Sequence, residues 1–454
     1  MSGKQYCSWG GYPVAVDQRG VRIDWRHEAL PLDQLNPGET ALPFGQGRSY
    51  GDACLNDGGL LFDMRHLNRF IAFDQENGII TCEAGVLISE ILDVVVPKGW
   101  FPTVTPGTKL VTVGGAIAND VHGKNHHRAG SFGHHVRRFE LVRSDGERMI
   151  CSPNENSEWF RATIGGLGLT GVILWAELQL RPIVNPWFDS ETIRYDDLAG
   201  FFALSAESDS DYEYTLSWLD CAATGKSLGR GHFMRGNHNA ESSSQGPNAP
   251  GKRKSVAITP PFPLVNRLTL KVFNFLYYTR QLSRSKKRLE HFDTFFYPLD
   301  AINNWNRIYG RKGFLQYQCV LPTDQAEGAS REILERVSAS RSGSFLAVMK
   351  MFGDHPPAGL LTFPRKGCTL SLDFPFRGRE TLDLLDSLDT IVVQVGGAIY
   401  PAKDARMAPE SFAQFFPNLD QFRSFVDPAL SSSLWRRLGG PATDQTSSGE
   451  GGGS

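Results

Sequence analysis

Lys403 stands among residues that could change the chemistry of its amine. It follows an aromatic residue, a proline and an alanine in YPAKDAR (400–406), a run that suits a packed pocket. Desolvation lowers the pKa of a lysine, so the amine can accept a proton near neutral pH or hold an anion while it is charged. A solvated surface lysine is the alternative. The neighbouring residue types favour proton transfer or anion binding.

Two glutamines occupy alternate positions of one largely apolar run. Gln316 and Gln318 flank Tyr317 in GFLQYQCVLP (313–322), and alternate side chains of a strand point to the same face. Two amides on one face suit the hydroxyl groups of a sugar. The alternative is a solvated strand face.

Two glycine-rich stretches could hold a phosphate group. GQGRSYGD (45–52) and PGTKLVTVGGAIANDVHG (106–123) carry little side-chain bulk, so their backbones can approach a ligand closely and present successive N–H groups to an anion. Tight turns between strands are the alternative for either stretch alone. Both stretches also carry polar side chains, namely Arg48, Tyr50, Asp52, Asn119, Asp120 and His122.

A third glycine-rich stretch imitates a nicotinamide fingerprint. GGLGLTG (165–171) contains a literal G-x-G-x-x-G, but the run VILWAELQLRP that follows reads as a strand. The dinucleotide fingerprint requires a helix to begin there, so that its N-terminus faces the pyrophosphate. This context argues against a classical NAD site.

Five histidines cluster at positions 122, 126, 127, 134 and 135. Zinc sites need three or four converging ligands, usually including cysteine or carboxylate, and Gly123 disfavours a helix that would align His122 with His126. We therefore predict no metal site. His122 is expected at the ligand site, and a packing or solvated role is the alternative.

Composition restricts the class of protein. A chain of 454 residues favours two domains, and a net charge of -2 gives no general attraction to nucleic acid. Seven scattered cysteines without a CxxC spacing fit reduced thiols in a cytoplasm. No signal peptide or membrane-spanning run is recognised. We expect a soluble, cytoplasmic protein.

Several runs predict an α+β fold. Residues 58–64, 77–85 and 139–152 read as strands, the last with an Asp145-Gly146 hairpin turn. Residues 86–99 have helical spacing and a proline-glycine stop. Residues 222–256 are polar and predict a mobile loop, and residues 441–454 predict a disordered tail.

The segment 252–289 combines ten Lys or Arg residues with interleaved aromatic and aliphatic residues, and it contains no Asp or Glu. Basic side chains near a membrane attract anionic headgroups, so the segment predicts a membrane-surface contact that weakens as salt rises. A solvated loop beside a buried helix is the alternative. Nucleic acid is not expected as a partner.

The motifs together resemble a known family. GQGRSYGD, PGTKLVTVGGAIANDVHGKNHH, GSFGHHV and GGLGLTGVI are similar, in order and spacing, to the FAD-binding half of the vanillyl-alcohol-oxidase superfamily. NNWNRIYGRKGFLQYQCVLP, AVMKMFGDH, TLSLDFPF and GGAIYPAKDARM more closely resemble the decaprenylphosphoryl-β-D-ribose 2'-oxidases, the FAD-dependent half of a ribose/arabinose 2'-epimerase.

This resemblance implies a two-domain α+β flavoprotein. Residues 1–186 would form a vanillyl-alcohol-oxidase-type FAD-binding domain, and residues 187–397 an antiparallel-sheet substrate (cap) domain. Residues 398–440 would return to the FAD-binding domain.

The resemblance also implies non-covalent FAD and assigns residues to it. The diphosphate would lie on backbone amides around Gly107 and Gly115, Asn119 to His122 would run beside the isoalloxazine, and Ile173 would meet the adenine side. The full set of expected cofactor residues is Gly45, Gln46, Gly47, Arg48, Ser49, Tyr50, Gly51, Asp52, Gly107, Thr112, Val113, Gly114, Gly115, Asn119, Asp120, Val121, His122, Ile173 and Tyr400.

For the reaction, the resemblance implies Lys403, His122 and Tyr50 as catalytic residues. The expected substrate residues are Gln316, Gln318, Lys350, Phe352, Ser371 and Lys403, with Asn306 and Arg307 as weaker candidates. Ser371 stands where mycobacterial-type enzymes carry a cysteine, which argues against capture of activated nitro-aromatics by a thiol.

The implied reaction is oxidation of the C2 hydroxyl of a polyprenylphosphoryl-β-D-ribofuranose to the 2-keto sugar. A separate NAD(P)H-dependent short-chain reductase would complete the epimerisation, and the protein would be peripheral at the inner membrane face. The electron acceptor, oxygen or a quinone, stays open. The alternatives are an FAD enzyme acting on another sugar, an alditol or a lactone, and a nucleotide-binding regulatory protein with an inactive flavin site.

Overall fold

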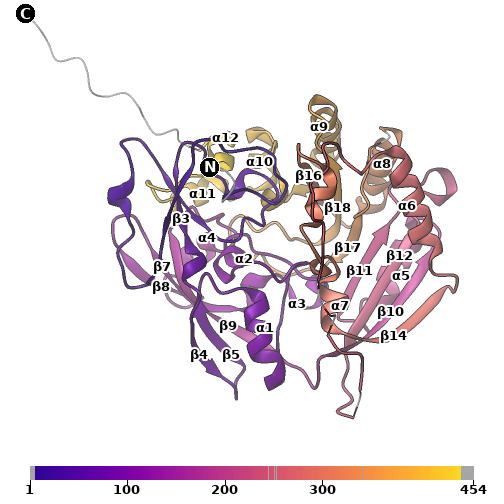
Figure 1. Cartoon of the computed structure of the whole chain (residues 1–454), viewed down its shortest axis with the longest axis horizontal. Helices are drawn as coiled ribbons and strands as arrows, with labels where there is room; N and C mark the ends of the chain where they lie inside the picture. The colour runs from indigo at the N-terminus through magenta and orange to yellow at the C-terminus, as the bar shows by residue number, and fades with distance from the viewer. Residues whose placement is uncertain (1–5, 244, 250, 252, 341, 441–454) are drawn as a thin grey trace, which may run out of the picture.

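The computed structural model describes residues 6–440 except 244, 250, 252 and 341. The predicted tail at 441–454 and Lys252 of the basic segment therefore lie outside the described residues. Two units stand side by side in Figure 1, an indigo-to-purple unit from the first part of the chain and a pink-to-orange unit from the middle. The yellow C-terminal helices return to the first unit.

The first unit is built on a six-stranded sheet of order β4-β5-β9-β7-β8, with β6 paired to β9. Its strands are β4 (Phe70–Asp74), β5 (Ile79–Glu83), β6 (Trp100–Pro102), β7 (Val136–Val142), β8 (Arg148–Cys151) and β9 (Val172–Pro182). A parallel sheet of β1 (Arg19–Arg22), β3 (Leu60–Asp63) and β2 (Ala41–Phe44) lies beside it. Its helices are α1 (Ile88–Val95), α2 (Val113–Ala118), α3 (His126–Ala129) and α4 (Ser157–Thr163).

Most of the local predictions for this unit are confirmed. β7 and β8 form the expected hairpin, and Gly146 in its turn has a φ of 86°. α1 is followed by a short 3-10 turn and by Gly99 in the left-handed conformation, which ends the helix at the predicted stop. β9 begins directly after GGLGLTG, so the strand that argued against an NAD site is present.

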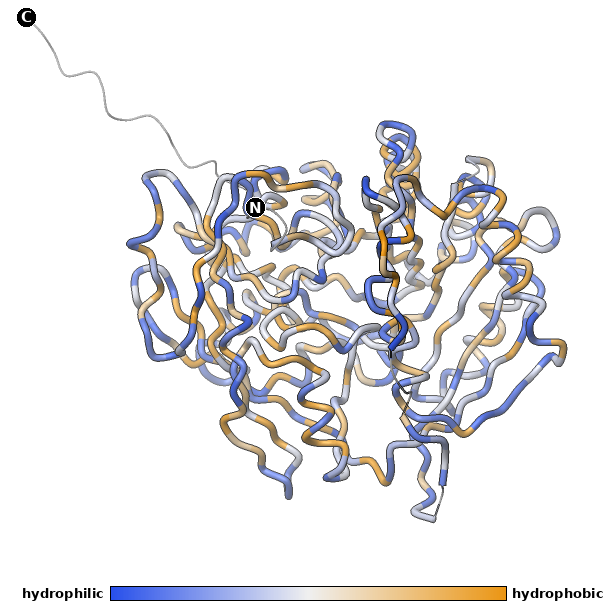
Figure 2. The backbone as a smooth tube through the Cα atoms, viewed as in Figure 1, coloured by the Kyte–Doolittle hydropathy of each residue, from blue (hydrophilic) through white to orange (hydrophobic). Residues whose placement is uncertain are grey.

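The second unit is an antiparallel sheet of eight strands, in the order β14-β10-β12-β11-β17-β18-β16-β19. The strands are β10 (Trp187–Tyr195), β11 (Tyr214–Leu219), β12 (Gly231–His238), β14 (Ser285–His291), β16 (Phe314–Leu321), β17 (Val348–Phe352), β18 (Gly367–Pro375) and β19 (Ala398–Ile399). Its helices are α5 (Leu198–Ser208), α6 (Arg267–Thr279), α7 (Phe292–Phe296), α8 (Ala326–Ala339) and α9 (Arg379–Gln394). Residues of α5, α8 and α9 share one apolar core with the sheet. In Figure 2, hydrophobic and hydrophilic residues are interspersed along the chain of both units. The fold is α+β, as predicted.

The prediction of a loop over residues 222–256 is wrong for Gly231–His238, which form the inner strand β12. Several polar residues of this strand have partners that its own sequence does not show. Arg235, for example, pairs with Glu191 at 2.9 Å and Glu207 at 2.8 Å, whereas both ring nitrogens of His238 are buried without a hydrogen-bond partner among the described residues. A polar composition predicted a loop because cross-strand ion pairs cannot be read from one segment alone.

The C-terminal segment joins the two units. β19 still pairs with β16 of the second sheet, so the return to the first unit begins after residue 399 rather than at 398. Beyond it lie α10 (Pro409–Phe415), α11 (Leu419–Arg423) and α12 (Ser433–Arg437). Arg437 binds Asp52 at 2.9 Å and Asp404 at 2.8 Å, which fastens α12 to the loop at 45–52. The remaining domain limits stay a prediction.

Candidate active site

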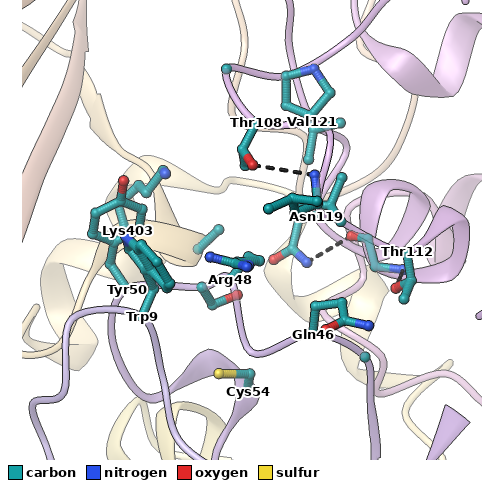
Figure 3. A pocket seen from close by; sticks show the side chains of 18 of the residues that line it. Trp9, Gln46, Arg48, Tyr50, Cys54, Thr108, Thr112, Asn119, Val121 and Lys403 are labelled. Atoms are coloured by element: carbon teal, nitrogen blue, oxygen red, sulfur yellow. Dashed lines mark hydrogen bonds between the residues drawn. The ribbon is translucent and has the colours of Figure 1, made fainter. Parts of the chain in front are cut away.

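A cavity of about 590 Å³ lies between the two units and is lined from both. Figure 3 shows Gln46, Thr112 and Asn119 of the first unit around it, with Lys403 beside Tyr50. The predicted residues that line it are Gly45, Gln46, Gly47, Arg48, Ser49, Tyr50, Gly107, Thr112, Gly114, Gly115, Asn119, Val121, His122, Ile173, Gln316, Gln318, Lys350, Ser371, Tyr400 and Lys403.

The two glycine loops meet at one wall of this cavity. Thr112 caps α2, and its Oγ1 accepts a hydrogen bond from the backbone N–H of Gly115 at 3.2 Å. A Cβ built on Gly45 would lie 2.5 Å from the same Oγ1, so the loops touch. At Gly107, by contrast, an added Cβ would meet no described atom within 4 Å. Gly107 therefore faces open cavity, whereas Gly45 is required by packing.

Gly114 also serves packing. An added Cβ would lie 3.0 Å from the Cβ of Ala84 and 3.3 Å from its carbonyl oxygen. The backbone N–H of Gly114 donates to that oxygen at 2.8 Å. A side chain at Gly114 would thus push α2 off Ala84 before it reached any ligand.

Arg48 adds a positive charge to the same wall. Its guanidinium lies 4.1 Å from the ring centroid of Trp9, and its Nε is buried without a hydrogen-bond partner among the described residues. Burial lowers the pKa of Arg48. A buried N–H donor that lacks a partner at a cavity is an anion-binding feature.

A segment of the second unit, residues 292–301 and here called the strap, packs against the loop 105–109. The hydroxyl groups of Tyr297 and Thr105 lie 2.6 Å apart. Asp300 accepts from Thr108 Oγ1 at 2.7 Å and from the backbone N–H of Lys109 at 2.9 Å. Lys109 Nζ lies 2.6 Å from Asp293. These contacts hold the strap against the loop at 105–109.

The opposite wall carries a buried cluster around His122. Lys350 Nζ donates to His122 Nδ1 at 2.7 Å and to the carbonyl oxygen of Gly123 at 2.6 Å. Gln318 contacts the other ring nitrogen, Nε2, at 2.9 Å and Thr369 Oγ1 at 3.2 Å. Burial lowers the pKa of Lys350 and of His122 well below their usual values, and the Lys350 charge lowers that of His122 further. His122 is therefore neutral, and its two neighbours hold the orientation of its ring.

Lys403 lies on a short 3-10 turn, Pro401–Lys403, beside the loop at 45–52. Its Nζ is 3.8 Å from the ring centroid of Tyr50, and the backbone N–H of Tyr50 donates to Ala402 at 2.9 Å. Burial lowers the pKa of Lys403 to about 7, while the charge of Asp373 opposes the shift. The amine can therefore exchange a proton near neutral pH.

Gln316 and Gln318 both face the cavity from β16, as the alternation predicted. Gln316 Nε2 donates to Asp373 Oδ1 at 2.6 Å. Asp373 is completely buried on β18, and its pKa is raised to about 7 by desolvation. The sequence analysis missed this residue.

Five predicted residues do not line the cavity: Gly51, Asp52, Val113, Asp120 and Phe352. Asp52 pairs with Arg437, and Asp120 accepts from the backbone N–H of Gly133 at 2.9 Å. A Cβ at Gly51 would lie 1.7 Å from the carbonyl oxygen of Asp404. Val113 is core, and Phe352 packs behind His122 with ring centroids 4.9 Å apart. These residues support the wall rather than form it.

The two weaker candidates also have structural contacts. Asn306 donates to the carbonyl oxygen of Trp9 at 3.1 Å, and Arg307 donates to those of Val256 and Ala257. Neither lines the cavity.

Several lining residues were not predicted, among them Trp9, Lys124, Thr108, Asn303 and Thr369. Lys124 Nζ donates to the carbonyl oxygen of Phe295, and burial lowers its pKa to about 7. Its place in HGKNHH, beside His122, was a usable signal. Trp9 precedes all the motifs, and nothing in its own segment marks it.

Apart from His122, the clustered histidines hydrogen-bond to different backbone groups. His126 Nδ1 accepts from the backbone N–H of Gly353 at 3.2 Å, and His127 and His135 contact carbonyl oxygens at 3.0 and 2.8 Å. Over the part of the chain that the structure describes, no three His, Cys, Asp or Glu residues are grouped to hold a metal ion.

Comparison with known proteins places this site in a family. A model described as an FAD binding domain matches residues 36–152, a range that includes both glycine loops. Decaprenylphosphoryl-beta-D-ribose oxidase of Mycolicibacterium smegmatis is 36% identical over 422 residues, 88% of this chain and 89% of the relative. An uncharacterized protein in the mprA 5' region of Streptomyces coelicolor is 33% identical over 373 residues, 78% of this chain and 100% of the relative. Cytokinin dehydrogenase 10 of Oryza sativa subsp. japonica is 31% identical over 160 residues, 34% of this chain and 29% of the relative.

The cavity fits the cofactor of that domain. The open space at Gly107 and the unpartnered Nε of Arg48 provide close backbone approach and a donor for an anionic group, as a flavin diphosphate requires. The chain is an FAD-dependent oxidoreductase, and it belongs to the family of decaprenylphosphoryl-beta-D-ribose oxidases.

Proposed function

We propose that this enzyme oxidises the C2 hydroxyl of a polyprenylphosphoryl-β-D-ribofuranose to the 2-keto sugar. The observation that carries the proposal is the pairing of the two cavity walls. One is a glycine-rich wall within the FAD-binding domain, and the other presents Lys403 and the amides of Gln316 and Gln318. When bound, FAD supplies the acceptor for the hydride that leaves C2.

The wall that carries Lys403, Gln316 and Gln318, here called the polar wall, would bind the sugar and take up its proton. Lys403, with its pKa of about 7, takes up the hydroxyl proton or holds an anionic group of the substrate. Gln316 and Gln318 hold the neighbouring hydroxyl groups. Burial lowers the pKa of His122 and keeps it neutral, and Lys350 helps to orient its ring. The amine of Lys403 lies against the ring of Tyr50. Ser371 gives this wall a small polar group in place of a thiol.

The flavin is held without a covalent bond in this proposal. Both ring nitrogens of His122 already contact a neighbouring side chain. Nδ1 contacts Lys350 Nζ, and Nε2 contacts Gln318 Nε2. A histidine used in this way has no free nitrogen for attachment. Acid precipitation should leave the yellow colour in the supernatant, and flavin that stays with the pellet would contradict this point.

The reaction is tested by the spectrum of the purified protein and an anaerobic titration with polyprenylphosphoryl-ribose. We expect the flavin absorbance to bleach in proportion to added substrate. Bleaching by a free alditol or lactone, with none from the lipid-linked sugar, would favour the alternative enzyme. Bound flavin that no sugar bleaches would favour a regulatory nucleotide-binding protein.

The product implies a partner. Completion of an epimerisation requires reduction of the 2-keto group from the other face, so we propose a separate NAD(P)H-dependent short-chain reductase as the next enzyme.

A membrane contact through the basic segment is part of the same proposal. α6 buries Leu270, Asn274 and Tyr278 but exposes Leu268 (72%) and Leu276 (59%), among other large apolar residues. The exposed set on this segment is Ile258, Phe262, Leu264, Leu268, Val272, Phe273, Phe275, Leu276 and Leu282. Ser255, at the start of the same segment, lines the cavity. An apolar face framed by basic residues suits an anionic membrane surface, and it would leave the lipid tail of the substrate in the bilayer.

The structure contains no membrane-spanning helix within the described residues. We therefore propose peripheral attachment at the cytoplasmic face of the inner membrane. Co-sedimentation with anionic vesicles should fall when Lys286, Lys287 and Arg288 are replaced together by glutamate, and separately when Leu268 and Leu276 become serine. Replacement of the exposed Lys366, Arg379 and Arg423 by glutamate is the control. Binding that is equal in all variants would remove α6 and β14 from the proposal.

A further inference from the structure

Five polar residues form a stripe on the two neighbouring strands β16 and β18. Gln316 and Gln318 alternate on β16, and Thr369, Ser371 and Asp373 alternate on β18. The register places Gln316 opposite Asp373 and Gln318 opposite Ser371. Gln316, Gln318, Thr369 and Ser371 reach the cavity, whereas Asp373 lies behind Gln316.

Asp373 is held from three directions. Gln316 Nε2 donates to Oδ1 at 2.6 Å, and the Tyr309 hydroxyl donates to Oδ2 at 3.3 Å. Its backbone N–H donates to Ser344 Oγ at 3.0 Å. Tyr309 is itself fixed, because its ring stacks on Phe314 with centroids 4.2 Å apart. Burial of a carboxylate costs desolvation free energy, so a completely buried carboxylate with defined neighbours indicates a specific role.

We propose that Asp373 is the positioning residue of the polar wall, an inference that rests on the proposed oxidation. Its carboxylate orients the Gln316 amide and supplies the negative charge that balances Lys403. Because the Nε2 group of Gln316 is committed to Asp373, its carbonyl oxygen is the group left to accept from a sugar hydroxyl.

Charged groups of both signs lie near Lys403. Lys350 lies near enough to be affected by the Lys403 charge, and Tyr50 lies under the amine. His122 is neutral. Asp373 is the anion that raises the pKa of Lys403 against burial, and Lys403 in turn lowers that of Asp373. Loss of the Asp373 carboxylate should therefore lower the pKa of Lys403.

The test is a direct titration of Lys403 in the flavin-loaded enzyme. Acetic anhydride is applied across a pH series, and acetylation of the Lys403 peptide is followed by mass spectrometry. Asp373→Asn should lower the midpoint of Lys403 acetylation by about one pH unit or more. In the pH profile of substrate-driven flavin reduction, the apparent pKa that belongs to Lys403 should fall by the same amount. Tyr309→Phe, which removes only one donor to Asp373, should lower the midpoint less.

Asp389→Asn is the matched control, because Asp389 is also a largely buried carboxylate but pairs with Arg406. It should leave the Lys403 midpoint unchanged. An unchanged midpoint in Asp373→Asn would overturn the inference, whatever happens to the rate. If Asp373→Asn fails to fold, an unchanged midpoint in Tyr309→Phe overturns it instead. The labelling needs no sugar, so a substrate that fails to bleach the flavin would count against the proposed function alone.

Discussion

The two walls of the cavity offer different chemical groups to a ligand. The wall of loops 45–50 and 107–115 offers backbone N–H groups and open space, with Arg48 as its charged side chain among the predicted residues. The wall of β16, β17, β18 and the turn at 401–403 offers buried amines, amides and a carboxylate. Backbone donors do not titrate, whereas the charge of each buried amine or carboxylate depends on pH.

This difference separates two kinds of sensitivity. The glycine wall should respond to added bulk and hardly to pH, because its shape is its function. The polar wall should tolerate small changes of shape and respond strongly to charge. On the proposed function, the cofactor would stay bound at any ordinary pH while the side chains of the polar wall control proton movement.

The largest effect is expected on the polar wall. Lys403→Ala should keep its flavin but lose about 10²–10⁴-fold in the rate of flavin reduction, which is the usual loss for a general acid–base group. Stopped-flow absorbance with the lipid-linked sugar measures this rate. Lys366→Ala, an exposed lysine paired with Asp354, is the control. A rate near that of the parent protein would remove Lys403 from the mechanism.

Two glycine substitutions test whether the other wall works by shape. Gly107→Val should fold normally but bind little flavin, since its side chain enters open cavity. Gly114→Val should lose flavin and also about 1–3 kcal/mol of unfolding free energy, because it collides with Ala84. Flavin content and urea unfolding distinguish the two. Full flavin occupancy in Gly107→Val would place the cofactor elsewhere.

The buried amines also predict a pH dependence of stability. Lys124 and Lys403 have folded pKa values of about 7, below the ordinary value of 10.5. Between pH 7 and 9 the unfolded chain binds more protons, so stability should rise with pH, by at most about 1.4 kcal/mol per pH unit for each lysine. Urea midpoints of the flavin-loaded protein measure this slope. Lys124→Met should flatten it, and an equal slope in that variant would contradict the burial of its charge.

The smallest effect is expected for Ser371→Cys. Ser371 lies in the cavity wall opposite Gln318, but no step of the proposed reaction uses its oxygen. The rate of flavin reduction should change by less than about tenfold, since a small volume-conserving change costs under about 1.5 kcal/mol. The variant should instead gain a reactive thiol, seen as iodoacetamide modification of that peptide. A larger loss of rate would give the hydroxyl a direct role.

The sequence predictions failed differently at the two walls: four predicted loop residues do not line the cavity, whereas on the polar wall Phe352 does not line it and Asp373 was missed. Gly107 and Gln46 line the cavity, which the local order of their motifs predicted, and their roles toward the cofactor stay a prediction. Lys403 and the two glutamines line the cavity, as their neighbours and strand alternation predicted. Asp373 could not be found, because its importance depends on the register that places it opposite Gln316.

The errors have the same origin. Asp52 stands inside a cofactor motif, yet it turns away to bind Arg437, which lies 385 positions later in the sequence. Phe352 lies two residues after Lys350 on β17 but packs behind His122. Such long-range partners leave no trace in a local pattern. The inner strand β12 was missed for this reason as well.

The strap over loop 105–109 has a consequence for the lifetime of the complex. Tyr297, Asp300 and Asp293 each fasten a residue of that loop from the second unit. A dinucleotide bound beneath these contacts would leave only after they open, so local opening would limit its exit rate. The flavin would then persist through many catalytic cycles as a resident group, and its replacement would be slow compared with turnover.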